Sequence, residues 1–153
     1  MLQIKNLTFT HRRDLRILLA DFRLLLNPGD RAVIVGEEGN GKSTLLKWIY
    51  DPALVEPYVE AEGERAWDGR MAYLPQELPE SERELSVYAF FSGKESFWNA
   101  EHRELQLLAR ELGLPGEVYY SEQTMGSLSG GERVKLSMAR LLLERPDILL
   151  LQF

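Results

Sequence analysis

Hydrophobic and polar residues alternate near the start of the chain. Residues 2–9 carry apolar side chains at every second position, with an irregularity at Asn6. Alternation with a period of two predicts a β-strand that buries one face. Residues 16–26 are a second strand candidate, and the turn-forming residues 27–30, "NPGD", follow it.

Two further patterns extend the predicted β part. Residues 31–35, "RAVIV", form a short apolar run that predicts a buried strand. Residues 58–67 and 70–74 flank Asp68-Gly69, a pair favoured in tight hairpin turns. We therefore expect these two segments to pair as a hairpin.

Helical patterns dominate the second half. Residues 44–50 suit a helix, and residues 97–112 predict another with one apolar face, formed by Trp98, Leu105, Leu108 and Leu112. The acidic stretch 76–84 before it is expected to be a solvated linker. Residues 130–144 predict a further helix, ended before Pro146. Residues 148–151, "ILLL", then predict a strand covered on both faces.

This order of elements predicts an α/β fold with a P-loop core, a β-hairpin or antiparallel β part and an inserted α-helical subdomain. We expect one domain in three parts. Residues 1–75 form the core and β part, 76–128 the helical insert, and 129–153 a helix and a strand. Because only two residues follow the last predicted strand, we expect the domain to be C-terminally incomplete.

Composition narrows the class of protein. The 153 residues are 44% hydrophobic and 27% charged, as in soluble globular domains. A formal net charge of −6 argues against nonspecific binding to nucleic acid or to an anionic membrane. The absence of cysteine excludes disulfides and thiolate chemistry. With no long apolar run and no signal peptide, we expect a cytoplasmic protein without direct membrane insertion.

The strongest chemical signal is residues 36–43, "GEEGNGKS", which match G-x-x-x-x-G-K-[ST] between a predicted strand and a predicted helix. Glycines let the backbone curl so that N–H groups point at phosphate oxygens. Lys42 supplies a positive charge, and the Ser43 hydroxyl is of the type that ligates Mg²⁺. The alternative is a glycine-rich turn without a ligand, but a chance match is about a one-in-a-hundred event. Glu37 and Glu38 inside the loop should weaken phosphate binding unless they face solvent.

A second glycine motif, "LSGGE", opens the predicted helix 130–144. Ser129 and Glu132 have the spacing of a capping box, which explains them without any ligand. Gly130-Gly131 is costly inside a first helical turn, however, and it bares N–H groups to a close approach. A phosphate is the obvious group to approach there.

Taken in order, the P-loop, a glutamine after a short strand, "LSGGE" and "RPDILLL" resemble an ATP-binding cassette (ABC) ATPase domain over essentially the whole chain. Two stretches, "MAYLPQE" and "LSGGERVKLSMARLLLERPDILLL", look like the ABC-F branch, whose soluble members carry two cassettes and act on the ribosome.

The resemblance implies roles for individual residues. The Walker A loop, which would bind ATP with Mg²⁺, comprises Gly36, Gly39, Asn40, Gly41, Lys42, Ser43 and Thr44. Gln76 would touch Mg²⁺ or the attacking water, and Ser43 would be a Mg²⁺ ligand. His11 stands where the family stacks an aromatic ring on adenine, although an exposed loop histidine explains it equally well.

The signature residues imply a partner. In the family they contact the γ-phosphate of ATP held by a second cassette, so that one cassette makes half of each site. The matching residues here are Ser129, Gly130, Gly131 and Glu132.

The resemblance also exposes a departure. After the Walker B strand the family has Asp, which orders Mg²⁺, and then Glu, which orients the attacking water. This chain has Gln152 and Phe153 at those places. Phosphoryl transfer depends on positioning and electrostatics, so we expect nucleotide binding with little or no hydrolysis.

Three functions remain open. The first is an ABC-F-like ATPase domain with the ribosome as a possible partner, and the second is a transporter cassette that docks on a membrane-embedded subunit. The third is a non-catalytic fragment. Unpaired strand edge and apolar surface also predict self-association.

Overall fold

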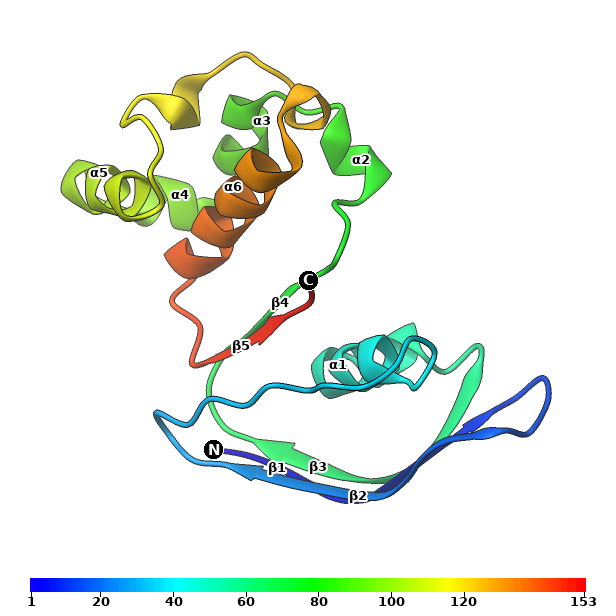
Figure 1. Ribbon diagram of the computed structural model, residues 1–153. Helices are drawn as coiled ribbons and strands as arrows, with labels where there is room; N and C mark the ends of the chain where they lie inside the picture. Colours follow the sequence, from blue (N-terminus) through cyan, green and yellow to red (C-terminus); the bar gives the residue numbers. More distant parts are fainter. The chain divides into compact units, whose positions relative to one another are not determined.

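The computed structural model describes residues 1–153 and divides them into two compact units. The β unit comprises Met1–Ala72 and Asp147–Gln152, and the helical unit comprises Tyr73–Pro146 with Phe153 (Figure 1). Each unit is described by itself.

An antiparallel sheet forms the base of the β unit. Strands β1 (Leu2–His11), β2 (Ile17–Leu26) and β3 (Val59–Trp67) have the order β2-β1-β3. Its central strand β1 buries Leu2, Ile4, Leu7 and Phe9. The register with both neighbours shifts near Asn6, which has a positive φ of 50°. This bulge inserts one extra residue and so keeps both pairs of apolar side chains on one face. The irregularity predicted at Asn6 is therefore confirmed.

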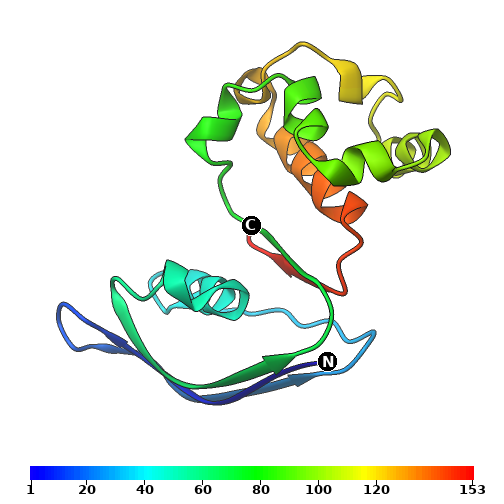
Figure 2. The same ribbon diagram turned by 180° about the vertical axis from the view of Figure 1, so that it is seen from behind.

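Helix α1 (Lys42–Tyr50) covers the inner face of this sheet (Figure 2). Trp48 packs edge-on against Phe9, with ring centroids 5.9 Å apart, and Ile49 is 1% exposed. A short 3-10 turn, η1 (Pro52–Leu54), follows, and Asp51 caps it by accepting from the Ala53 N–H at 3.1 Å. Because α1 packs on the sheet, the end of the loop that precedes it has a fixed position in the β unit.

The predicted strand at residues 31–35 is wrong. The segment has no regular secondary structure and belongs to neither sheet, and Val33 and Val35 are 85% and 88% exposed. Apolar runs indicate residues that a sheet would bury, but a strand forms only where a neighbouring strand completes its hydrogen bonds. Here β1 takes β2 and β3 as its partners.

The predicted hairpin around Asp68-Gly69 is also wrong. Strand β3 pairs with β1, whereas β4 (Met71–Leu74) pairs with β5 (Ile148–Leu151) in a two-stranded sheet. Gly69 has a φ of 88°, and a Cβ there would lie 2.5 Å from the Asp147 carboxylate. That carboxylate accepts from the Arg70 N–H at 2.7 Å. The glycine therefore admits a close approach of Asp147 instead of closing a hairpin.

The helical unit contains five helices and two 3-10 turns. They are α2 (Glu80–Arg83), α3 (Val87–Ser92), α4 (Glu95–Asn99), α5 (His102–Glu111), η2 (Val118–Tyr120), η3 (Met125–Ser127) and α6 (Gly130–Leu143). The last agrees with the helix predicted over 130–144.

Two predictions in this unit need correction. The single helix expected over residues 97–112 is two helices, because the chain is extended at Ala100 and Glu101. Trp98 is not on the apolar face, since it is 62% exposed and its Nε1 donates to the Ser92 carbonyl at 2.8 Å. The stretch 76–84, expected as a linker, includes α2.

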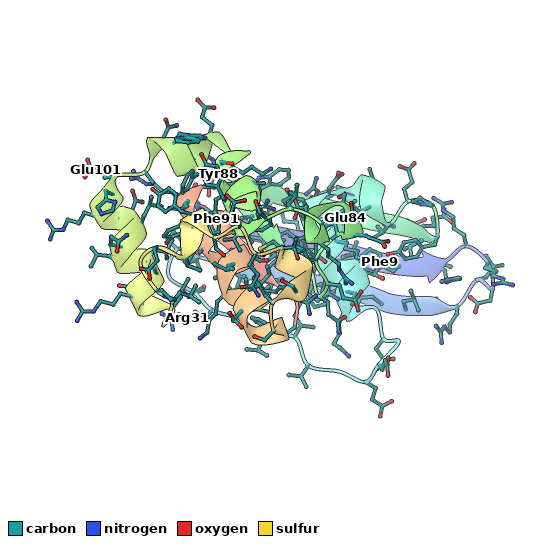
Figure 3. The ribbon with its side chains drawn as sticks, turned by 90° about the horizontal axis from the view of Figure 1, so that it is seen from above. Phe9, Arg31, Glu84, Tyr88, Phe91 and Glu101 are labelled. Carbon is teal, nitrogen blue, oxygen red and sulfur yellow. The ribbon has the colours of Figure 1, made fainter.

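Aromatic rings form the centre of the helical core. Phe91, labelled in Figure 3, meets Tyr119 edge-on at 4.9 Å. The Tyr119 hydroxyl donates to the Leu105 carbonyl at 2.7 Å and so satisfies both groups inside the core. Burial raises the pKa of Tyr119 to about 12.

One arginine connects three helices of this unit. Arg140 on α6 contacts Glu82 on α2 through two hydrogen bonds of 2.9 and 3.0 Å. Its guanidinium also lies 3.6 Å from the ring centroid of Phe90 on α3. The side chains of Arg140 and Glu82 are only 15% and 25% exposed, so the pair is screened less than a surface pair.

Candidate functional site

The loop of residues 36–41 turns directly into α1. Gly39 and Gly41 have φ values of 83° and 81°, in the left-handed region that other residues adopt at a cost. Gly41 is the N-cap, and no side chain caps the helix. The first backbone N–H groups of a helix have no partner within it. Because no side chain caps α1, these N–H groups are available to bind an anion.

Lys42 turns its ammonium back over this loop. Its Nζ donates to the carbonyl oxygens of Gly36 and Glu37, the second at 2.6 Å. The loop thus folds around a positive charge, which favours an anionic phosphate nearby. Glu37 and Glu38 are both exposed, so their carboxylates are in contact with solvent.

The next residue of α1 makes an unexpected contact. The Gln152 side chain follows β5, and its Nε2 donates to the Ser43 hydroxyl oxygen at 2.6 Å. From the sequence we interpreted Gln152 only as the loss of a carboxylate, so this hydrogen bond was not predicted. No local pattern indicated it, because 109 positions separate Gln152 from Ser43.

The Mg²⁺ implied by the loop pattern does not fit these residues. Magnesium requires oxygen ligands in octahedral geometry and is usually held by one or two carboxylates together with substrate phosphates. No group of three or more His, Cys, Asp or Glu could hold a metal. The Ser43 oxygen, the expected ligand, accepts instead from an amide N–H.

The other predicted loop residues occupy different environments. Thr44 is 8% exposed and helps to bury the helix against the sheet, whereas Asn40 is exposed and its N–H donates to the Glu37 carbonyl at 3.3 Å. His11 lies at the end of β1, with its ring 29% exposed and its Nδ1 3.4 Å from Asp14. All three belong to the β unit.

The remaining predicted residues belong to the helical unit. Gln76 lies after β4 and is exposed. At the start of α6, the Ser129 hydroxyl accepts from the Glu132 N–H at 3.2 Å and donates to the Glu132 carboxylate at 2.9 Å. The predicted cap is therefore present, although the carboxylate binds the hydroxyl and not the backbone.

Nothing in the chain requires glycine at positions 130 and 131. Both have ordinary backbone angles, and a Cβ built on either meets no atom within 4 Å. Their backbone thus faces open space at the first turn of a 14-residue helix. Glycine there leaves room for a group from outside the chain.

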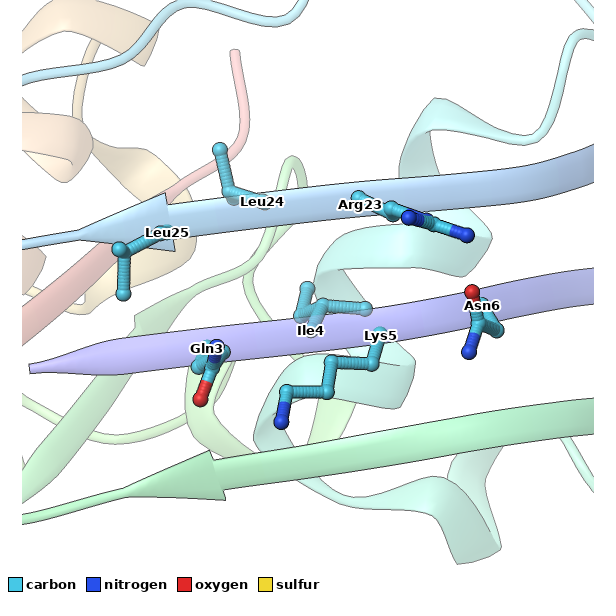
Figure 4. Close-up of a pocket in the computed structure, with 7 residues that line it drawn as sticks. All are labelled: Gln3, Ile4, Lys5, Asn6, Arg23, Leu24 and Leu25. Carbon is cyan, nitrogen blue, oxygen red and sulfur yellow. The ribbon is translucent and has the colours of Figure 1, made fainter.

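A depression of 330 Å³ lies elsewhere on the β unit, on strands β1 and β2 (Figure 4). Its polar lining includes Lys5 and Arg23, and Arg23 lies 3.6 Å from Asp21. None of the predicted phosphate-binding residues lines it.

Comparison with known proteins agrees with the loop geometry. The family described as ABC transporter matches residues 19–152, so the chain belongs to this family as an ATP-binding domain. Elongation factor 3 of Phytophthora infestans is 36% identical over 136 residues, which cover 88% of this chain and 12% of that protein. The zinc import ATP-binding protein ZnuC of Ruegeria sp. (strain TM1040) is 32% identical over 152 residues, covering 99% and 57%. The chain therefore spans only part of these relatives.

Solved structures show the same fold. A structure described as an inward-facing conformation of an ABC transporter of the metal-chelate type is 22% identical, with a TM-score of 0.69, covering 98% of this chain and 59% of that one. The predicted α/β fold with an ABC-type P-loop core is thereby confirmed. No helix of the chain is both long enough and apolar enough to cross a membrane.

Proposed function

We propose that this chain is the nucleotide-binding domain of an ABC-type ATPase and holds ATP with little or no hydrolysis. The observation that carries the proposal is the loop before α1. Two left-handed glycines shape it, the first turn of α1 lacks a side-chain cap, and Lys42 places its ammonium inside the curl. These are the groups that bind a polyphosphate.

Slow hydrolysis follows from the residues after β5. Gln152 carries no charge, and Phe153 has no group that accepts a proton or orients water. Gln76 remains as a polar group that is able to position water, but an amide is not a base at neutral pH. We therefore expect bound ATP to persist.

The start of α6 supports a second partner, another ABC cassette. Gly130 and Gly131 leave open space above a helix N-terminus, although neither the backbone angles nor the packing of this chain requires glycine. A γ-phosphate presented by the other cassette is negatively charged, as a helix N-terminus favours, and is small enough to approach the open backbone of these glycines. Ser129 and Glu132 hold the turn in the required conformation. The chain is also expected to self-associate, because Val33 and Val35 are exposed.

The wider assembly has two candidates, both cytoplasmic. A transporter-type subunit that docks on a membrane-embedded partner is supported by the likeness to ZnuC over nearly the whole chain. An ABC-F-like protein that acts on the ribosome is supported by the likeness to elongation factor 3. Co-sedimentation with washed membranes supports the first, and co-sedimentation with ribosomes supports the second.

Isothermal titration calorimetry with ATP tests the binding proposal. Lys42→Ala removes the ammonium from the loop and is expected to weaken ATP binding at least about tenfold, since a charge-assisted phosphate contact contributes about 1.5–3 kcal/mol. Lys47→Ala, in the same helix but outside the loop, is the matched control and should bind as the unsubstituted chain does. Equal affinity of all three proteins would reject the proposal.

A further inference from the structure

We infer that Gln152 makes nucleotide binding by this chain independent of Mg²⁺. The inference rests on the proposed function, because it concerns how the same loop holds ATP. It starts from the 2.6 Å hydrogen bond in which Gln152 Nε2 donates to the Ser43 hydroxyl.

The hydrogen bond sets the direction of the Ser43 hydroxyl. A serine hydroxyl has one hydrogen to donate and two lone pairs that accept. The Gln152 amide occupies one lone pair, so the hydroxyl hydrogen points elsewhere. Ser43 is exposed and lies beside the cationic loop residue Lys42. Its hydroxyl is thus oriented to donate to a phosphate oxygen.

The same contact disfavours a cation at Ser43. A metal ion would have to take the remaining lone pair of the Ser43 hydroxyl oxygen, next to Gln152 amide hydrogens whose partial positive charge repels it. No carboxylate at position 152 compensates for this, and no cluster of acidic or histidine side chains supplies other ligands. Magnesium that does bind is then held by the phosphates and water alone.

Gln152 is therefore a positioning residue that acts through Ser43. It converts Ser43 from a metal ligand into a phosphate donor, and the chain recognises the triphosphate through Lys42, Ser43 and the backbone of the loop. Because a bound metal ion would contact only the phosphates and water and no side chain of the protein, its removal should leave the affinity for ATP nearly unchanged.

The test is ATP affinity measured by calorimetry with excess Mg²⁺ and, separately, with EDTA. For the unsubstituted chain we expect the two dissociation constants to agree within about threefold. Gln152→Asp places a carboxylate beside Ser43, so we expect ATP to bind at least about tenfold more weakly in EDTA than with Mg²⁺. Gln123→Asp, at an exposed position of the helical unit, adds the same charge and should leave the ratio of the two constants unchanged.

A second variant isolates the positioning role. Gln152→Ala removes the donor to Ser43 and introduces no charge, so we expect ATP binding to weaken about three- to tenfold in both solutions, as for the loss of one hydrogen bond.

Two results would overturn the inference. If the unsubstituted chain binds ATP with Mg²⁺ but loses more than about tenfold in EDTA, metal independence is wrong and the proposed function stands. If ATP binds in neither solution, both the proposed function and this inference fail.

Discussion

The proposed nucleotide site depends on single residues at the start of α1 and directly after β5. Gly41 and Lys42 shape and charge the loop, as in other P-loops, while Gln152 gives Ser43 a partner that a metal site would not provide. The loop was predictable from the sequence because its residues are contiguous. The Gln152–Ser43 contact was not, since 109 positions separate the two residues.

Replacement of Gly41 tests the backbone of the loop. Gly41→Ala forces a side chain into a φ of 81° and should destabilise the chain by about 1–2 kcal/mol. Gly131→Ala has an ordinary helical φ and open space, so it should stabilise the chain by about 0.5–1 kcal/mol. Urea unfolding measures both changes in stability. Destabilisation of equal size in the two variants would contradict the assignment of a left-handed backbone to Gly41 and of a helical backbone to Gly131.

Tyr119 gives a prediction for alkaline pH. Its pKa, raised by burial to about 12 from an ordinary value of 10.0, means that folding favours the protonated phenol. The stabilisation is complete below the ordinary pKa and is lost as the pH rises through about 12. The absorbance of phenolate should therefore show one ionisation step at about pH 12.

Tyr119→Phe should remove this late step, whereas Tyr120→Phe, which replaces a 52% exposed neighbour, should leave it in place. Persistence of the step in Tyr119→Phe would assign it to another residue. Tyr119→Phe should also cost about 0.5–1.5 kcal/mol, because the hydrogen bond from the phenol to the Leu105 carbonyl is lost.

Among the secondary-structure elements, the sequence predicted those that local pattern controls. The strands near 2–9 and 16–26 and the helix from Gly130 appear close to their expected bounds. The segment 31–35 and the turn at Asp68-Gly69 were misread, because pairing between distant strands decides them. Local composition carries no information on which strand becomes the neighbour of which.

The helices of the helical unit depend on Arg140. Arg140→Ala leaves Glu82 half-buried without its cation and removes the contact with the Phe90 ring, so we expect a loss of about 2–4 kcal/mol in unfolding free energy. Arg145→Ala is the control, because its side chain is 77% exposed and its pair with Glu104 should contribute less than about 1 kcal/mol. Similar losses in the two variants would mean that the buried contacts of Arg140 stabilise the fold no more than an exposed ion pair does.

The whole molecule consists of two units that carry different functional residues. The β unit holds the P-loop, Ser43 and Gln152, and the helical unit holds Gln76 and the glycines at the start of α6. Each unit has its own apolar core. Family membership follows from the order of these motifs along the chain, which is why it was predictable from the sequence. The residues after β5, Gln152 and Phe153, supply neither an acid nor a base.

The most direct test of binding without turnover uses ATP labelled at the γ-phosphate. The chain is incubated with the labelled nucleotide and separated from free nucleotide by rapid gel filtration, and the bound label is identified by thin-layer chromatography. We predict that the label travels with the chain as intact ATP, and that Lys42→Ala carries much less of it. Release of labelled phosphate over many turnovers, abolished by Lys42→Ala, would contradict this prediction.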